Sequence, residues 1–469
     1  MSNIKHTANY LIGNIGIKAL GFISIPFFTH YLSVEEFGLM SLYSTVLIFL
    51  STLLSLGMLG SFKRYYFENN DDFGAFLFSN ILFLGLFFSS FVFLYFYIIQ
   101  DISIFLDIPQ DMLKYTIFIS FLSLLVKVKL DFLQVQEHSK KNIILDFIQA
   151  LVLLVFAISF MLYLDNNKFF GKIYGDMIGY GILAIYSMYK LIKIIEFKFD
   201  LKYIKYSLLF GLPVLPSMFS SFGLSFADRL MINKITDASD VGLYSFAFMI
   251  AMLLQVIISA VGKSWQPLFY KAMSNKDYKL LDNIFKINSK IVFGASLFLI
   301  LFSYEFVYLL ATSEYIKSLD IVLFLIIGFN FFFLYTAYGQ YVSYSKKTYI
   351  DSIITITAVV LNIGLNYIYI PKYGYEASAI TTIISYAFMF IMFYFNAKYF
   401  LKYRVINIFI ISKIILSYFI LLLVFLYINM IIDNYLVLLF IKFILINSYL
   451  IYNYWDNITQ FKNEKKWLK

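Results

Sequence analysis

The chain alternates, from one end to the other, between apolar runs of about 20 residues and short polar segments. A helix of that length rises about 1.5 Å per residue, so each run would cross the roughly 30 Å of hydrocarbon in a bilayer. The pattern predicts fourteen transmembrane helices, at residues 8–31, 38–61, 75–99, 112–132, 143–164, 172–192, 205–232, 240–262, 290–311, 318–341, 350–370, 376–399, 405–429 and 434–453.

The composition agrees with a polytopic membrane protein. Of the 469 residues, 61% are hydrophobic and 14% are charged, and the mean hydropathy is +0.80. This leaves too little polar surface to cover the core of a soluble domain. The first run lacks a small-residue cleavage site and is interpreted as a retained helix. There is no cysteine, which excludes disulfides and thiolate metal sites.

Positive charge alternates between successive loops. Most of the 37 lysines and arginines fall on the side that holds both termini, whereas the first two longer loops on the other side, "SVEEFG" and "QDISIFLDIPQD", are acidic. The positive-inside rule therefore predicts that both termini are cytoplasmic. Attraction to anionic membrane lipids explains the net charge of +9, so the charge calls for no nucleic-acid partner.

The loops leave no room for a soluble catalytic domain. Outside loops hold about a dozen residues or fewer, and the longest inside segment, 263–290, has room for one amphipathic helix. No "GxxxxGK[ST]" motif is present, and the three histidines show no metal-ligand spacing. We therefore predict a non-enzyme with no cofactor and no metal site, coupled to an H⁺ or Na⁺ gradient or driven by consumption of its product.

Two segments that begin helices resemble each other. Glu36-Phe37-Gly38-Leu39 aligns with Asp240-Val241-Gly242-Leu243 at an offset of 204 residues, the length of six helices with their loops. The pattern predicts two six-helix lobes, residues 1–200 and 201–400, related by an axis along the membrane normal, followed by two appended helices and a basic tail at 401–469. The alternative is that acid-x-Gly is an ordinary capped turn before a helix.

Three stretches carry a resemblance to a known family. "PFFTHYLSVEEFGLMSLYSTV", "DRLMINKITDASDVGLYSFAFMI" and "LNIGLNYIYIPKYGYEASAITTIISY" resemble the polysaccharide-transporter (Wzx-like) branch of the MATE-like MOP flippase superfamily, over roughly residues 1–400. The resemblance implies a protein of the bacterial plasma (inner) membrane that flips undecaprenyl-diphosphate-linked oligosaccharides to the outer leaflet by alternating access. Such units build O-antigen, capsule or exopolysaccharide. Polysaccharide polymerase and chain-length proteins are the implied partners.

The family lines its cavity with cations from its first, second and eighth helices. The matching positions here are Lys18, Arg64 and Lys263. Lys18 lies near mid-membrane, where an ammonium is costly and normally faces a bundle interior with a partner. A diphosphate fits that requirement. Arg64 and Lys263 lie at inner helix ends, where the positive-inside bias is an alternative explanation.

The segment Leu209–Ile232 carries features that are costly in a spanning helix. Pro213 and Pro216 predict a hinge, although prolines in a first turn bend a helix less. Asp228 with Arg229 is a candidate gating pair, although an Arg at a helix end also snorkels to the interface. Asp146 and Asp176 are further candidates for gating or cation coupling.

Sugar recognition needs hydrogen-bonding groups at membrane depth. The candidate amides are Asn14, Gln255, Asn362 and Asn366. Two alternatives to the flippase stay open. A cation-coupled multidrug exporter of the same superfamily should favour acidic cavity residues, and Lys18 argues against it. A membrane-embedded polysaccharide polymerase or ligase would need a large outer loop.

Overall fold

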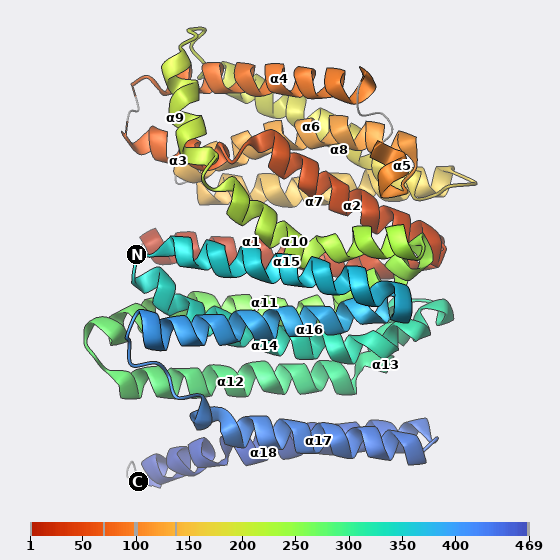
Figure 1. Cartoon of the computed structure of the whole chain (residues 1–469), viewed down its shortest axis with the longest axis vertical. Helices are drawn as coiled ribbons and strands as arrows, with labels where there is room; N and C mark the ends of the chain where they lie inside the picture. Colours follow the sequence, from red (N-terminus) through yellow and green to blue (C-terminus); the bar gives the residue numbers. More distant parts are fainter. Residues whose placement is uncertain (1, 69–70, 98–101, 137, 467–469) are drawn as a thin grey trace. The chain divides into compact units, whose positions relative to one another are not determined.

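In a computed structural model, residues 2–68, 71–97, 102–136 and 138–466 are described, without the side chains of residues 2–15, 139, 348 and 455–466. All regular structure among these residues is helical (Figure 1). The chain forms two compact units, Met1–Ser245 with Leu310–Thr312 and Ile370–Tyr375, and Phe246–Leu309 with Ser313–Tyr369 and Glu376–Lys469. The lobe boundary predicted at residues 200–201 falls inside the first unit and stays a prediction.

The first unit is a bundle of ten helices and the start of an eleventh. They are α1 Ser2–Tyr31, α2 Val34–Ser55, α3 Leu59–Glu68, α4 Phe73–Tyr97, α5 Ile102–Leu106, α6 Gln110–Val135, α7 Ser139–Tyr163, α8 Phe170–Ile192, α9 Leu201–Gly211, α10 Leu215–Ile235 and the start of α11 Ala238–Ser274. Helix α7 packs between α1 and α8, and α6 packs against α2 and α8.

The second unit continues α11 and adds the C-terminal helices. They are α12 Tyr278–Leu301, α13 Ser303–Leu310, η1 Ser313–Ser318, α14 Leu319–Tyr344, α15 Thr348–Tyr373, α16 Glu376–Phe395, η2 Asn396–Phe400, η3 Ile408–Ile411, α17 Ser412–Ile431 and α18 Tyr435–Lys466. Helix α14 packs along α16, and α12 contacts α14, α17 and α18.

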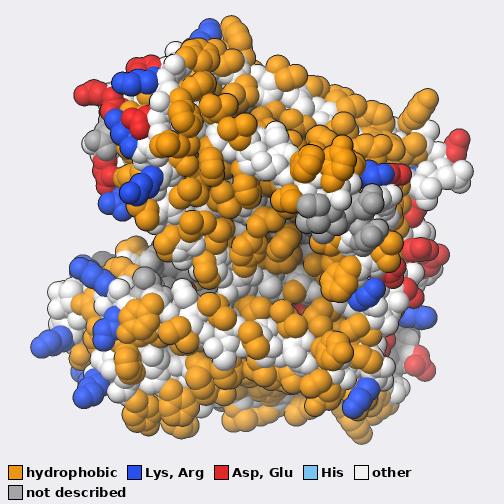
Figure 2. All heavy atoms as spheres, turned by 45° about the horizontal axis from the view of Figure 1, so that its top comes forward, with side chains coloured by type: hydrophobic (Ala, Val, Ile, Leu, Met, Phe, Trp, Pro, Cys, Tyr) orange, Lys and Arg blue, Asp and Glu red, His pale blue; other side chains and the backbone are white. Residues whose placement is uncertain are grey.

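Within the described part of the chain, each predicted transmembrane segment lies for most of its length on a helix or on consecutive helices. Among the described residues, ten helices are long and apolar enough to cross a membrane, and the bent pair α9–α10 makes eleven. The other three predicted segments are α1, α6 and α8, which carry charged residues within their length. Hydrophobic side chains cover most of the surface seen in Figure 2, and charged side chains lie chiefly at its left and right edges. This is the distribution of a membrane-embedded bundle.

Three predicted boundaries were wrong. The predicted helix 38–61 breaks at Leu56 and Gly57, which adopt the left-handed conformation with φ of 46° and 68°. The predicted helix 290–311 breaks between α12 and α13, at Phe302. The predicted loop 263–290 is almost entirely helical, because α11 runs to Ser274 and α12 begins at Tyr278. Helices that extend beyond the apolar run explain the last error.

A buried ion pair fixes α18 to α13. The Lys442 ammonium lies 2.7 and 2.9 Å from the two carboxylate oxygens of Glu305, and Lys442 is 4% exposed. Sequence analysis assigned no role to Lys442, because only the tertiary structure brings it to Glu305. The pair anchors the last helix to the second unit.

Loss of this pair should destabilise the protein. We expect Lys442→Ala to lower the free energy of unfolding by about 3–5 kcal/mol, since it leaves the half-buried Glu305 carboxylate without its cation. Thermal unfolding in detergent measures the effect. The double variant Glu305→Leu with Lys442→Met should recover most of the loss, and Lys413→Ala, which removes a cation above the Tyr452 ring, is the matched control. Equal melting temperatures for the wild type and Lys442→Ala would contradict this role.

Candidate functional site

Lys18 is exposed on α1. No carboxylate among the described side chains lies within ion-pair distance of its ammonium. The partner predicted for Lys18 is a diphosphate, and this assignment stays a prediction. The charge of Lys18 is available to an anion from outside the helix bundle.

The second candidate cation is already paired. Arg64 lies on α3 with its Nε 2.6 Å from a carboxylate oxygen of Glu68, and Glu68 also accepts a hydrogen bond of 2.6 Å from Tyr206 Oη. The Tyr206 hydrogen bond and the Arg64 guanidinium lower the pKa of Glu68. The adjacent Lys63 contacts Asp131 at 2.9 Å. Both cations thus belong to an ion-pair cluster at the end of α3.

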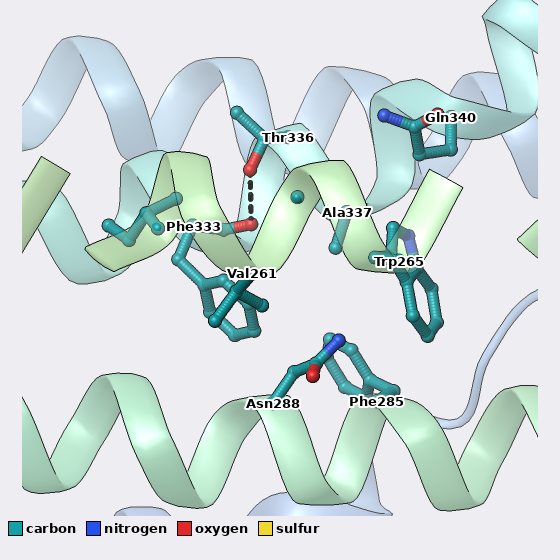
Figure 3. A pocket seen from close by; sticks show the side chains of 10 residues that line it. Val261, Trp265, Phe285, Asn288, Phe333, Thr336, Ala337 and Gln340 are labelled. Atoms are coloured by element: carbon teal, nitrogen blue, oxygen red, sulfur yellow. Dashed lines mark hydrogen bonds between the residues drawn. The ribbon is translucent and has the colours of Figure 1, made fainter. Parts of the chain in front are cut away.

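The third candidate cation, Lys263, lies exposed on α11 in the second unit, two turns beyond the half-buried Gln255. Near it, α11, α12 and α14 enclose a cavity of about 30 Å³, which Figure 3 shows with Trp265, Asn288 and Gln340 along its wall. The space has room for water but not for a sugar ring. This cavity is therefore too small to be a sugar-binding pocket.

A stripe of glycines beside Asp176 packs α8 closely against α7. Gly171, Gly175 and Gly179 recur every four residues on one face of α8. A Cβ at Gly175 would lie 2.4 Å from the backbone nitrogen of Ala157. Small residues at this spacing allow close approach of membrane helices. The following residue, Asp176, is thereby held in the helix packing.

Asp176 is 2% exposed and fully engaged. Lys172 Nζ, one turn earlier on α8, lies 2.6 Å from Oδ1, and Tyr43 Oη of α2 donates to Oδ2 at 2.8 Å. Sequence reasoning named the aspartate but missed Lys172 and Tyr43. The Lys–Asp spacing of four residues was the available signal for Lys172, whereas nothing in the sequence indicated Tyr43.

Asp228 and Arg229 are buried beside the start of α11, with 1% and 6% exposure. Tyr244 Oη donates to Asp228 at 2.7 Å. Arg229 Nε donates to Ser245 Oγ at 3.0 Å, and its Nη1 donates to the Ser225 carbonyl at 2.9 Å. Arg229 is thus packed inside the first unit and does not snorkel to a surface. The pair joins α10 to α11.

Asp146 differs from the other acidic candidates. It is half-buried on α7, and no hydrogen bond or ion pair from another described residue reaches its carboxylate. A carboxylate in hydrocarbon without a cation is costly when ionised, so it favours a bound proton or metal cation. Asp146 therefore stays a candidate for cation coupling.

The candidate amides of α15 lie inside the helix packing. Asn362 and Asn366 are 1% and 0% exposed. Asn366 Nδ2 donates to Asn362 Oδ1 at 3.2 Å, and Thr381 of α16 donates to Asn366 Oδ1 at 2.5 Å. In this structure their hydrogen bonds tie α15 to α16. The side chain of Asn14 lies outside the described residues.

The two prolines lie at a bend between α9 and α10. These helices meet at 47°, with Pro213 in the connecting turn and Pro216 in the first turn of α10, where its missing N–H costs no helical hydrogen bond. At the same place a Cβ on Gly57 would lie 2.5 Å from the Gly211 carbonyl oxygen. Two helix breaks therefore face each other, backbone against backbone.

The repeated motif occupies equivalent places on α2 and α11. Ser33 Oγ caps the start of α2, and Asp237, 204 residues later, caps α11. The two helix starts touch reciprocally, since a Cβ on Gly38 would lie 1.8 Å from Ala238 O and one on Gly242 would lie 2.2 Å from Val34 O. Reciprocal contacts of matching residues are typical of a twofold relation. The motif is thus both a cap and a close contact.

Together, the fold and the long apolar helices define a polytopic helical membrane protein. Among the described residues, no group of three His, Asp or Glu side chains is placed to hold a metal ion.

The sequence matches the family described as polysaccharide biosynthesis protein over residues 4–273, and this chain belongs to that family. Residues 213–368 also match the MatE family. Two proteins of Haemophilus influenzae (strain ATCC 51907 / DSM 11121 / KW20 / Rd) are related. "Lsg locus putative protein 1" is 24% identical over 59% of this chain and 68% of its own length. An "uncharacterized membrane protein" is 23% identical over 60% of this chain and 69% of its own length.

The fold is that of solved transporters. The structure resembles the lipid II flippase MurJ in an inward closed conformation, with a TM-score of 0.78, 18% identity and coverage of 97% of this chain and 100% of that one. It also resembles an inward-facing multidrug resistance MATE family transporter of the MOP superfamily, with a TM-score of 0.67, 14% identity and coverage of 82% and 96%. The predicted MATE-like fold is confirmed.

Proposed function

We propose that this protein is a flippase that moves undecaprenyl-diphosphate-linked oligosaccharides from the inner to the outer leaflet of the bacterial plasma membrane. Membership of the polysaccharide biosynthesis family carries the proposal, and the likeness to a lipid II flippase along almost the whole chain supports it. The product supplies O-antigen, capsule or exopolysaccharide synthesis, and the polymerase and chain-length proteins of that synthesis are the partners.

Lys18 is the group that we assign to the diphosphate. It is exposed on α1 and free of any ion pair with a described side chain, so it needs no rearrangement to accept an anion. Arg64 and Lys263 remain secondary candidates. Arg64 has to leave Glu68 before it binds substrate, which makes it the weaker of the two.

Transport in a purified system tests the proposal. The protein is reconstituted into liposomes with an undecaprenyl-diphosphate oligosaccharide in both leaflets, and a membrane-impermeant glycosidase reports how much substrate it reaches. Empty liposomes should expose about half, and active protein should expose nearly all within the assay. If proteoliposomes and empty liposomes release the same amount, with the protein folded, the flippase proposal is wrong.

The MatE match over residues 213–368 favours one alternative, a cation-coupled multidrug exporter. The two functions differ in the charge of their cargo, because an exporter of cationic drugs needs acidic groups in its cavity. Energy-dependent efflux of a cationic dye from cells that express this protein would support the exporter. Unchanged dye accumulation together with restored polymer in a flippase-deficient host would support the flippase.

A variant at Asp146 tests whether an ion gradient drives the transport. We expect Asp146→Asn to keep normal membrane abundance and substrate binding but to lose the stimulation of flipping by an imposed H⁺ or Na⁺ gradient, because Asn cannot exchange a cation. The proteoliposome assay, run with and without each gradient, measures this. Asp176→Asn is the comparison variant, since its carboxylate already has Lys172 as a partner. An unchanged response to both gradients in Asp146→Asn would rule out this role.

A further inference from the structure

A groove of about 730 Å³ lies between α6, α7 and α8 in the first unit. These helices lie side by side (Figure 1), and the polar part of the groove is where α6 and α8 end and α7 begins. Each helix contributes one cation there, Lys129 from α6, Lys141 from α7 and Lys190 from α8. The groove takes no part in the flippase site proposed above.

Lys129 is the central group of this cluster. It is only 8% exposed, and no carboxylate of a described residue lies within ion-pair distance of its ammonium. Among the described residues, the charged groups that act on it are two further cations, Lys190 and Lys141. The Phe132 ring, whose centroid lies 5.0 Å from Nζ, offsets a small part of the cost of this buried charge. A buried ammonium among like charges is costly without an anion.

Apolar walls continue from the cationic end. On α7 the groove is lined by Ile144, Ile148 and Val152, and on α8 by Ile182 and Tyr186. Both sets recur every four residues, so each forms one face of its helix. From Lys141 to Val152 the helix rises about 16 Å. The groove thus joins a site for an anion to an apolar channel about two helical turns long.

We propose that this groove binds an anionic phospholipid, with its phosphate among Lys129, Lys141 and Lys190 and an acyl chain between α7 and α8. Free phosphate would satisfy the three cations but would leave the apolar walls uncovered. A zwitterionic lipid would bring a fourth positive charge to a cluster that already holds three. In the predicted orientation the site faces the inner leaflet, which carries the anionic lipids that basic pockets between helices recognise.

The absence of cysteine makes the test direct. Ile148→Cys, in the groove, is labelled with a fluorophore, and the full-length protein is reconstituted in phosphatidylcholine vesicles that contain either brominated phosphatidylglycerol or brominated phosphatidylcholine. Ile356→Cys on α15 is the control, because it is similarly exposed, at 40% against 44% for Ile148, and is similarly far from its helix start. We expect brominated phosphatidylglycerol to quench the groove label more strongly than brominated phosphatidylcholine, and the control label equally.

Charge removal then tests the cation cluster. Replacing Lys129, Lys141 and Lys190 together by Gln should weaken the preference for phosphatidylglycerol about a hundredfold, since each Lys near a membrane surface attracts anionic lipid by about fivefold. The charge-matched control replaces the exposed lysines Lys276, Lys279 and Lys346 of the second unit by Gln and should keep the preference. Lys129→Gln alone should lower it several-fold.

Three results would overturn the proposal. They are equal quenching of the groove label by the two brominated lipids, an undiminished preference in the groove triple variant, and an equal loss in the control triple variant. Inorganic phosphate at millimolar concentration that changes the fluorescence of the groove label, while the two brominated lipids quench it equally, would show that the site takes a free anion and not the lipid. Because flipping is not part of the readout, failure here leaves the proposed flippase function intact.

Discussion

Cells that depend on this protein for surface polymer are expected to lose it when Lys18 is replaced by alanine and to keep it with Lys18→Arg. The ammonium of Lys18 is exposed and has no ion-pair partner among the described side chains. A charge-assisted hydrogen bond to a diphosphate contributes about 1.5–3 kcal/mol. Its loss should reduce transport by about ten- to a hundredfold, since 1.4 kcal/mol corresponds to tenfold. Polymer in a flippase-deficient host, normalised to membrane abundance on a blot, measures it.

Two controls separate this effect from a loss of folding. Lys127→Ala removes another exposed cation from the first unit and should leave polymer unchanged. Arginine keeps the charge at position 18 and so should retain most of the activity. Wild-type polymer from Lys18→Ala would show that Lys18 does not bind substrate, and the family assignment would still stand. Loss with both alanine and arginine at normal abundance would indicate a requirement for the shape of lysine and not for its charge.

A side chain at Gly38 is expected to stop transport. A Cβ there would lie 1.8 Å from the Ala238 carbonyl oxygen and 3.0 Å from the Gly242 nitrogen, and both are backbone atoms. Neither can move aside unless the starts of α2 and α11 separate. In the predicted orientation this contact lies at the outer end of both helices, one from each predicted lobe. We therefore expect Gly38→Val to prevent closure of that end.

The size of the effect follows from overpacking. Inserting side-chain atoms into a tight contact costs about 1–3 kcal/mol, so the closed arrangement should become about ten- to a hundredfold less populated. Transport should fall accordingly, with the protein still present in the membrane. Gly85→Val on α4 is the control, because a Cβ at Gly85 meets nothing within 4 Å. Normal polymer from Gly38→Val would refute the requirement for this contact.

The repeat at Gly38 and Gly242 shows what a sequence pattern can predict and what it leaves open. The sequence indicated the offset of 204 residues and the caps, because both depend on residues close together in the chain. It left open whether acid-x-Gly is a repeat or an ordinary turn. The structure shows capping at both copies and, in addition, reciprocal close contact between them.

The partners of the ionisable residues were the main feature that the sequence did not predict. The candidates Asp176, Asp228 and Arg64 were named from their depth or position. The structure adds their partners. Asp176 contacts Tyr43 and Lys172, Asp228 contacts Tyr244, and Arg64 contacts Glu68. One of these pairs, Tyr43 with Asp176, is separated by 133 residues. Depth in the membrane makes a charge costly, and the fold decides which residue compensates it.

By itself, the sequence determined the helices, their approximate ends, the predicted orientation and the family, because hydrocarbon thickness, local capping and the positive-inside bias act on contiguous residues. The tertiary structure decided which ionisable groups are paired. It joined Lys442 to Glu305, buried Asn362 and Asn366 in helix packing, and left Lys18 and Lys129 without a carboxylate partner among the described residues. Side-chain pairing depends on which helix faces meet, and in a chain that is apolar on almost every face no sequence period records that choice.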